Sequence, residues 1–258
     1  RSWSDRAIGV AAVVLLLQPV EWYHYIANLI NPAHRLPDLK VAEMYGEVAD
    51  YTKAGNWRDF LLGNVTLGQK ASFLWAVNAG RFVQTAGLFL LGFFIGRKQL
   101  FMTNEKNIVF WTKVLIISAI SFAPLYTLKE LVMENDPIVQ QTVGTAFDMW
   151  QKLAFTLVLV ASFILLYQHK NFSKAVAGLR FYGKMSLTNY ISQSIIGAFI
   201  YFPIGLNLAP YCGYTLSLSV GFLIFLLQLK FCKWWLARHK QGPLEYIWHK
   251  CTWIGTGK

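Results

Sequence analysis

The stretch Gly183–Ser194, GKMSLTNYISQS, opens a long apolar run and carries an unusual density of polar side chains. Thr188 and Ser192 are four residues apart, as are Asn189 and Gln193, so each pair would share one face of a helix. A polar group in hydrocarbon is costly without a partner, so this cluster should face protein or a water-filled cavity. Two interpretations stay open: hydrogen bonds that hold a helix bundle together, or a polar lining for a substrate.

Composition places the chain among membrane proteins. Its apolar fraction is 55% and its charged fraction only 14%, against about a quarter charged in soluble proteins. Mean hydropathy is +0.38, and several runs reach the roughly 20 apolar residues that cross a bilayer. The predicted class is an all-α, polytopic helical membrane protein embedded in the lipid bilayer. The three cysteines form no CxxC pair, which argues against a disulfide scaffold and a zinc site.

We predict about six transmembrane helices plus interfacial amphipathic helices. The predicted spans are residues 7–26, a segment within 71–95, 108–126, 147–167, 185–204 and 214–231. Pro19 should kink the first span, and Pro124 should end the third. Apolar residues at helical spacing predict an amphipathic surface helix within 39–55. A further helix should start at GPLEYIW, with Pro243 at its first position.

Charge predicts how the spans are oriented. Most of the 24 Lys and Arg residues flank the start of the first span and follow the second, fourth and sixth spans, where acids are few. The positive-inside rule then places both ends of the chain in the cytoplasm. The net charge of +11 is explained by this bias, so no nucleic-acid partner is predicted.

Few residues in the predicted spans carry chemistry. Arg81 could hold a carboxylate or phosphate with its guanidinium, or serve structurally by pairing with Asp148 or by reaching the interface. Asp148 and Lys152 would most simply form an i,i+4 pair. Glu21 and His24 share a helix face, but they fall where an interfacial belt is expected. A proton relay would need further acids deep in the predicted spans, and the sequence places none there, which speaks against a proton-driven transporter.

Four sequence blocks resemble one known family. GKMSLTNY, followed by Gln193–Ser194, is similar to the C-terminal signature of the YeiB-like bacterial membrane proteins, the domain-of-unknown-function 418 family. Phe89–Arg97 (FLLGFFIGR), the Gln228…Trp235 spacing and Gly242–Trp248 (GPLEYIW) fit the same pattern. The chain departs from it at Cys232, where the family tends to have Ser. The resemblance covers about residues 89–253.

The resemblance implies a single domain over residues 1–258, in a bacterial inner membrane, that lacks the family's N-terminal helices. Distant relatives of the family are membrane acyltransferases, which implies acyl-CoA as a co-substrate without a resident cofactor, and a lipid or sugar acceptor outside the cytoplasm. Arg180 and Lys184 would then contact the CoA phosphates. The substrate-lining candidates are Arg81, Thr188, Asn189, Gln193 and Gln228.

Two other functions remain open at this point. The His or Arg-Gly region that is essential in the acyltransferases has no match here, so the resemblance assigns no catalytic residue. A transporter or lipid-handling protein would use the same polar stripe as a permeation path, with Arg81 binding an anionic substrate. In a non-catalytic membrane subunit, the polar residues would only pack helices. No oligomeric state is predicted.

Overall fold

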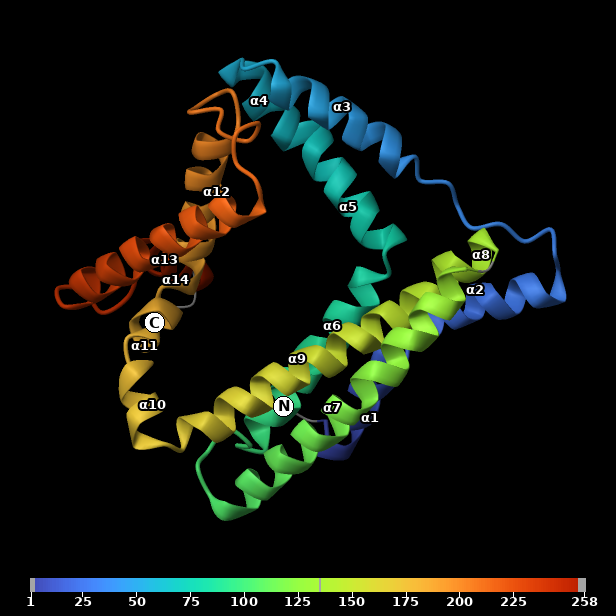
Figure 1. Cartoon of the computed structure of the whole chain (residues 1–258), viewed down its shortest axis with the longest axis horizontal. Helices are drawn as coiled ribbons and strands as arrows, with labels where there is room; N and C mark the ends of the chain where they lie inside the picture. Colours follow the sequence, from blue (N-terminus) through green and yellow to red (C-terminus); the bar gives the residue numbers. More distant parts are fainter. Residues whose placement is uncertain (1–2, 135, 255–258) are drawn as a thin grey trace. The chain divides into compact units, whose positions relative to one another are not determined.

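The computed structural model describes residues 3–134 and 136–254, and every regular element in this range is helical (Figure 1). The all-α prediction is therefore confirmed. The chain divides into two compact units, one formed by residues 1–42 and 70–170 and the other by 43–69 and 171–258.

Each unit contains helices from separate parts of the sequence. The first unit holds α1 (Asp5–Leu16), α2 (Pro19–Ile30), nearly all of α5 (Gln69–Asn78), α6 (Arg81–Arg97), α7 (Glu105–Met133), α8 (Pro137–Val139), the π-helical turn η2 (Gln140–Gly144) and α9 (Thr145–Tyr167). The second holds most of α3 (Val41–Lys53), α4 (Trp57–Gly63), the π-helical turn η1 (Asn64–Gly68), most of α10 (Lys170–Ala175), α11 (Leu179–Lys184), α12 (Ser186–Tyr201), α13 (Tyr214–Leu236) and α14 (Pro243–Thr252).

Within the described residues, three continuous helices are long and apolar enough to cross a membrane: Glu105–Met133, Pro137–Tyr167 and Tyr214–Leu236. Two bent helix pairs, α1 with α2 and α4–α5 with α6, raise the number of candidate spans to five if each pair counts as one. Only 11–17% of the most apolar window in each continuous helix is buried. Their apolar faces therefore need lipid, and the chain is a multi-pass membrane protein.

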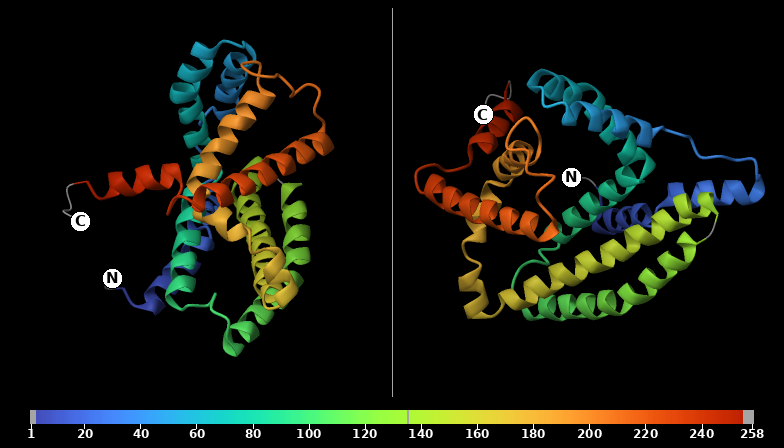
Figure 2. Two further views of the ribbon diagram at one scale, coloured as in Figure 1. Left: turned by 90° about the vertical axis from the view of Figure 1, so that its left-hand side faces the viewer. Right: turned by 45° about the horizontal axis from the view of Figure 1, so that its top comes forward.

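The first unit is built around two antiparallel pairings. Helices α7 and α9 lie side by side along most of their length (Figure 2), and α1 packs along α6. Asp5, at the start of α1, pairs with Arg97 and Lys98 at the end of α6, each at 2.7 Å. Gly87 makes the α1–α6 approach close, because an added Cβ there would lie 3.0 Å from Leu16.

Both bent pairs break at a residue with left-handed backbone. Pro19 begins α2 and cannot donate a hydrogen bond to the preceding helix, so the chain turns by 48° after Gln18, whose φ is 58°. The predicted kink at Pro19 is confirmed. Gly80, with φ of 60°, separates Asn78 from α6, and the helix axis there turns by 76°. Arg81 is consequently the first residue of α6.

Two predicted span boundaries differ from the structure. Helix α7 continues through Pro124 to Met133, so the prediction that Pro124 ends this helix is wrong. In hydrocarbon, losing one backbone hydrogen bond costs less than ending the helix, which would leave several groups unpaired. The predicted span 185–204 forms α12, which has 16 residues and ends before Pro203. It is shorter than the roughly 20 residues of a full span.

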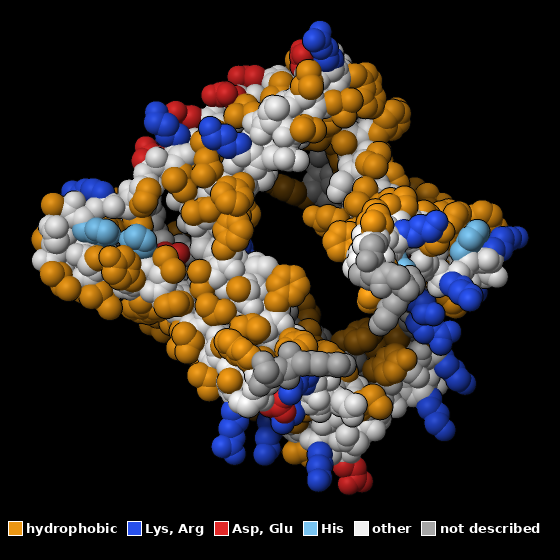
Figure 3. Space-filling view, turned by 180° about the vertical axis from the view of Figure 1, so that it is seen from behind, with side chains coloured by type: hydrophobic (Ala, Val, Ile, Leu, Met, Phe, Trp, Pro, Cys, Tyr) orange, Lys and Arg blue, Asp and Glu red, His pale blue; other side chains and the backbone are white. Residues whose placement is uncertain are grey.

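The second unit holds the signature helices. Helix α11 packs on α13, and α12 contacts both α11 and α14. The amphipathic helix predicted within 39–55 is α3, and α14 begins at Pro243 as predicted. Phe60 of α4 stacks obliquely on Phe202, with ring centroids 5.5 Å apart. Many hydrophobic side chains of both units are exposed at the surface (Figure 3).

Candidate functional site

The first turns of α12 and α14 are joined by reciprocal hydrogen bonds. The Thr188 hydroxyl donates to Glu245 Oε2 at 2.5 Å, and the Thr188 backbone N–H donates to Oε1 at 2.9 Å. In return, the backbone N–H of Leu244 donates to Thr188 Oγ1 at 3.2 Å. The N-terminus of each helix has free N–H groups and the positive end of the helix dipole. The Glu245 carboxylate therefore stabilises the N-termini of both α12 and α14. The two sequence blocks of the signature are thus in direct contact.

The Glu245 carboxylate is held in its charged form. Burial by itself would raise the pKa of this carboxyl, but the hydrogen bonds from the Thr188 hydroxyl and backbone outweigh it and keep the pKa below its ordinary value. The residue at the N-cap of α14 must be small here, because a Cβ on Gly242 would lie 2.1 Å from Glu245 Oε2. This explains the glycine that opens the GPLEYIW block.

Asn189 ties α12 to both neighbouring helices. It is only 2% exposed, and its amide nitrogen donates to the backbone oxygen of Tyr182 at 3.0 Å and to Cys232 Sγ at 3.2 Å. The Cys232 thiol lies 3.3 Å from Asn189 Oδ1, within reach for donating in return. A serine hydroxyl would have the same donor and acceptor capacity at this position.

Gln228 is the centre of a second group of hydrogen bonds. Its Oε1 accepts from Gln193 Nε2 at 2.9 Å and from the Tyr182 hydroxyl at 3.1 Å. Its Nε2 donates to Ser192 Oγ at 2.8 Å and to the Asn189 backbone oxygen at 3.3 Å. Gln193 also donates to the Tyr182 hydroxyl. We call these six side chains the signature network: Tyr182, Asn189, Ser192, Gln193, Gln228 and Cys232.

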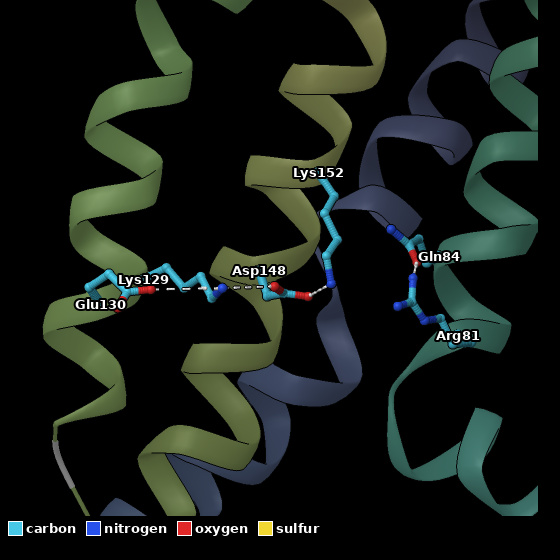
Figure 4. Close-up of polar contacts among 6 residues, drawn as sticks. All are labelled: Arg81, Gln84, Lys129, Glu130, Asp148 and Lys152. Atoms are coloured by element: carbon cyan, nitrogen blue, oxygen red, sulfur yellow. Dashed lines mark hydrogen bonds and ion pairs between the residues drawn. The ribbon is translucent and has the colours of Figure 1, made fainter. Parts of the chain in front are cut away.

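Arg81 belongs to the first unit, whereas the signature network belongs to the second. Its guanidinium donates to Gln84 Oε1 at 2.9 Å (Figure 4) and lies 5.6 Å from the ring centroid of Trp75. Its Nε is buried and has no hydrogen-bond partner among the residues that the structure describes. Arg81, Lys129 and Asp148 line a cavity of about 270 Å³.

Asp148 pairs with lysines on two helices. Lys152, one turn further along α9, contacts it at 2.5 Å, and Lys129 of α7 lies 3.3 Å away (Figure 4). The predicted i,i+4 pair is confirmed. The alternative pairing of Asp148 with Arg81 is not the one formed, because two closer ammonium groups already neutralise the carboxylate.

Basic and aromatic side chains surround the junction of α13 and α14. A cavity of about 690 Å³ is lined by Trp235, Arg238, His239, Lys240, Gln241, Gly242, Pro243, Tyr246 and Ile247. A neighbouring cavity of about 410 Å³ shares Arg238, His239 and Lys240 and adds Lys184. We call the two together the basic groove. Of the two basic residues that the resemblance singled out, Lys184 lines it, whereas Arg180 is exposed and lies over the ring of Phe181.

The structure adds residues that the sequence did not single out as site candidates. Glu245 and Tyr182 complete the signature network and the α12–α14 contact. Their only sequence signal was proximity to the signature blocks. In the first unit, Gln18 and Glu21 are buried, with 1% and 7% exposed. Glu21 is thus enclosed by protein, and His24, which shares its helix face, faces His34 with 3.1 Å between ring nitrogens.

Long apolar helices with a buried polar network define a multi-pass α-helical membrane protein. The family model described as a protein of unknown function, DUF418, matches residues 95–255, more than half of the chain. The chain belongs to this family, as the signature blocks predicted.

Two curated relatives, both from Bacillus, match part of the chain. The uncharacterised protein YxaH of Bacillus subtilis (strain 168) is 25% identical over 95 residues, which are 37% of this chain and 24% of the relative. An uncharacterised 39.9 kDa protein in the amylase 3′ region of Bacillus acidopullulyticus is 37% identical over 91 residues, 34% of this chain and 25% of that protein. The matches thus span about a quarter of each relative. No solved structure matches the chain.

Proposed function

We propose that the chain is the membrane part of an acyltransferase-like protein of the bacterial inner membrane, and that the basic groove binds acyl-CoA from the cytoplasm. The observation that carries this proposal is the groove itself. Its larger cavity of about 690 Å³ lies in the range of ligand sites. Arg238, Lys240 and Lys184 supply cations for phosphates, and Trp235 and Tyr246 supply faces on which a base can stack.

The charge distribution supports a cytoplasmic groove. The groove follows α13, in one of the Lys- and Arg-rich segments that the positive-inside rule assigns to the cytoplasm together with both ends of the chain. Cytoplasmic acyl-CoA would meet it directly. In acyl transfer, an acceptor hydroxyl forms an ester with the acyl carbon, the thioester bond breaks, and the hydroxyl proton leaves with the CoA thiol. The acceptor would be a lipid or sugar on the far side of the membrane.

The signature network supports a positioning role within this function. Thr188 and Glu245 fix the start of α14, and Asn189, Gln193 and Gln228 fix α13 against α12. Together they hold both walls of the groove. The hydrogen bonds of these residues are made within the protein, which favours positioning over lining a passage for the acyl group.

Titration of acetyl-CoA and longer acyl-CoAs into the full-length protein in detergent tests the proposal. We expect saturable binding that weakens at least tenfold in the Arg238→Gln/Lys240→Gln double variant, because two phosphate contacts are lost. Lys174→Gln, an exposed lysine outside the groove, is the matched control and should bind normally. CoA lacking its 3′-phosphate separates phosphate recognition from general attraction. Binding of anionic lipid but no acyl-CoA would overturn the proposal.

A second candidate function rests on Arg81. Its unpartnered Nε and the adjacent cavity of about 270 Å³ favour an anion-binding site within the first unit. On this hypothesis the protein transports or handles an anionic substrate without changing it. Uptake of a labelled substrate into proteoliposomes, lost in Arg81→Gln, supports transport; conversion of the substrate supports acyl transfer.

A non-catalytic membrane subunit is the third function, and the fully bonded Gln228 side chain favours it. On this hypothesis Asn189→Leu lowers the stability of the protein. The activity of a partner protein then falls only in proportion to the fraction of this protein that remains folded. A loss of turnover at full folding would count against it.

A further inference from the structure

The two helix breaks of the first unit meet at one point. Gln18 lies at the break between α1 and α2, and Gly80 lies at the break between α5 and α6. A Cβ placed on Gly80 would lie 2.7 Å from Glu21 Oε1 and 3.5 Å from Gln18 Oε1. Two side-chain oxygens from the first broken helix therefore converge on the break in the second. We call this place the break junction.

The polar groups of the break junction are buried without protein partners. Gln18 is 1% exposed, and neither its amide oxygen nor its amide nitrogen has a hydrogen-bond partner in residues 3–134 and 136–254. Glu21 is 7% exposed, and within the described residues its carboxylate makes neither a hydrogen bond nor an ion pair. A buried amide and a buried carboxylate without partners are both unfavourable in a protein interior. A bound ligand that supplies the missing partners would offset this cost.

The walls of the break junction are packed and aromatic. Trp150 of α9 donates from its indole N–H to the backbone oxygen of Leu16 at 2.8 Å, and its ring stacks on Trp22, with centroids 6.2 Å apart. The Met149 methyl would lie 3.3 Å from a Cβ on Gly80. These contacts make the junction a fixed part of the unit, close to two fluorescent side chains.

The charged groups near the junction are engaged elsewhere. Arg81 follows Gly80 directly but donates to Gln84. Asp148, from α9, is paired with Lys129 and Lys152. On α2 itself, His24 faces His34. None of these groups forms an ion pair with Glu21 in the described part of the chain, so its carboxyl group is left for a ligand.

We propose that the break junction binds a small monovalent cation, an alkali-metal ion or a proton, between the Glu21 carboxylate and the Gln18 amide oxygen. A single carboxylate is neutralised by a single positive charge. Divalent cations prefer several acidic ligands, and the described residues contain no cluster of three or more His, Cys, Asp or Glu side chains suited to a metal. Breaks in membrane helices are places where cations are bound at depth. Glu21 thereby supplies the buried acid that the sequence had not indicated.

Thermal unfolding of the full-length protein in detergent tests the proposal. Choline is replaced stepwise by Na⁺ or K⁺ at constant ionic strength, and Tm is followed by tryptophan fluorescence. We expect a saturable rise in Tm with one of the two ions, abolished in Glu21→Gln. Glu47→Gln, which neutralises an exposed acid on α3, is the matched control and should keep the response. Gln18→Leu, which retains the carboxylate, should weaken the apparent ion affinity about two- to tenfold.

The proton is distinguished by infrared spectroscopy. If a proton is the occupant, neither ion raises Tm, and the wild type at neutral pH shows a protonated-carboxyl C=O band that is missing from Glu21→Gln. Absence of both the ion response and this band would overturn the proposal, since water alone would then complete the junction. If Glu21→Gln does not fold, the Gln18→Leu shift and the wild-type band decide the matter. Acyl-CoA binding is not measured here, so failure of one proposal leaves the other standing.

Discussion

The signature network and the break junction both bury polar side chains, but only the network provides them with partners. Gln228 uses its amide oxygen and nitrogen in four contacts with neighbouring helices. Gln18, buried to a similar degree, has no hydrogen-bond partner for either atom in the described part of the chain. The same side-chain amide therefore builds architecture in one unit and marks a candidate binding site in the other. The structural role and the binding role are therefore distinguished by whether the side chain is hydrogen-bonded within the protein, and not by its polarity.

The largest expected effect follows from removing the centre of the network. Gln228→Leu should lower the free energy of unfolding by about 2–3 kcal/mol, because it removes all four hydrogen bonds of a buried side chain. The measurement is unfolding in mixed detergent–dodecyl sulfate micelles. Gln69→Leu, at an exposed position, should change stability by no more than about 0.5 kcal/mol. Equal effects of the two variants would mean that the network is not structural.

The next effect concerns the α12–α14 contact. Thr188→Val keeps the shape of the side chain but removes the hydroxyl that bonds Glu245 and Leu244, and should cost about 1–2 kcal/mol. Ser194→Ala is the control, because that hydroxyl bonds only within its own helix. Combining Thr188→Val with Glu245→Gln should cost less than the sum of the single changes. Strict additivity would show that the two residues act independently.

Substitution of Gly242 tests the α12–α14 contact by steric hindrance, without removing a hydrogen-bonding group. Gly242→Ala introduces a Cβ 2.1 Å from the position of Glu245 Oε2, so the carboxylate must move away from Thr188. We expect a loss of about 1 kcal/mol. Protease sensitivity of the segment after Gln241 gives an independent measure of α14 release. An unchanged cleavage rate would show that the carboxylate finds an equivalent position.

The α12–α14 contact should also respond to pH in a defined direction. The folded state holds the pKa of Glu245 below the ordinary value of 4.5. The stabilisation that the charged Glu245 carboxylate gives to the folded protein is therefore fully present above pH 4.5. It is lost as pH falls through the lower, folded-state pKa. The stability difference between wild type and Glu245→Gln should therefore shrink on acidification below pH 4.5. A difference that grows on acidification would contradict the assignment.

Sequence alone predicted the architecture well and the partners poorly. Hydropathy located the long helices, and spacing on one helix face picked out Thr188, Asn189 and Gln193. It could not join Thr188 to Glu245, because that contact links residues 57 positions apart through packing. The burial of Glu21 within the protein was missed for a related reason. Its aromatic neighbours are typical of an interface, but the break at Gln18 turns α2 and brings Glu21 against Gly80.

The smallest expected stability effect makes the comparison sharpest. Gln18→Leu is the same chemical change as Gln228→Leu at a similarly buried site, yet it removes no protein hydrogen bond. Replacing an unpartnered buried amide by an apolar group of similar size is neutral or stabilising. In choline buffer, without alkali cations, Gln18→Leu should therefore unfold at the wild-type denaturant midpoint or above it. A loss as large as that of Gln228→Leu would mean that Gln18 has structural partners, and the distinction between the two regions would fail.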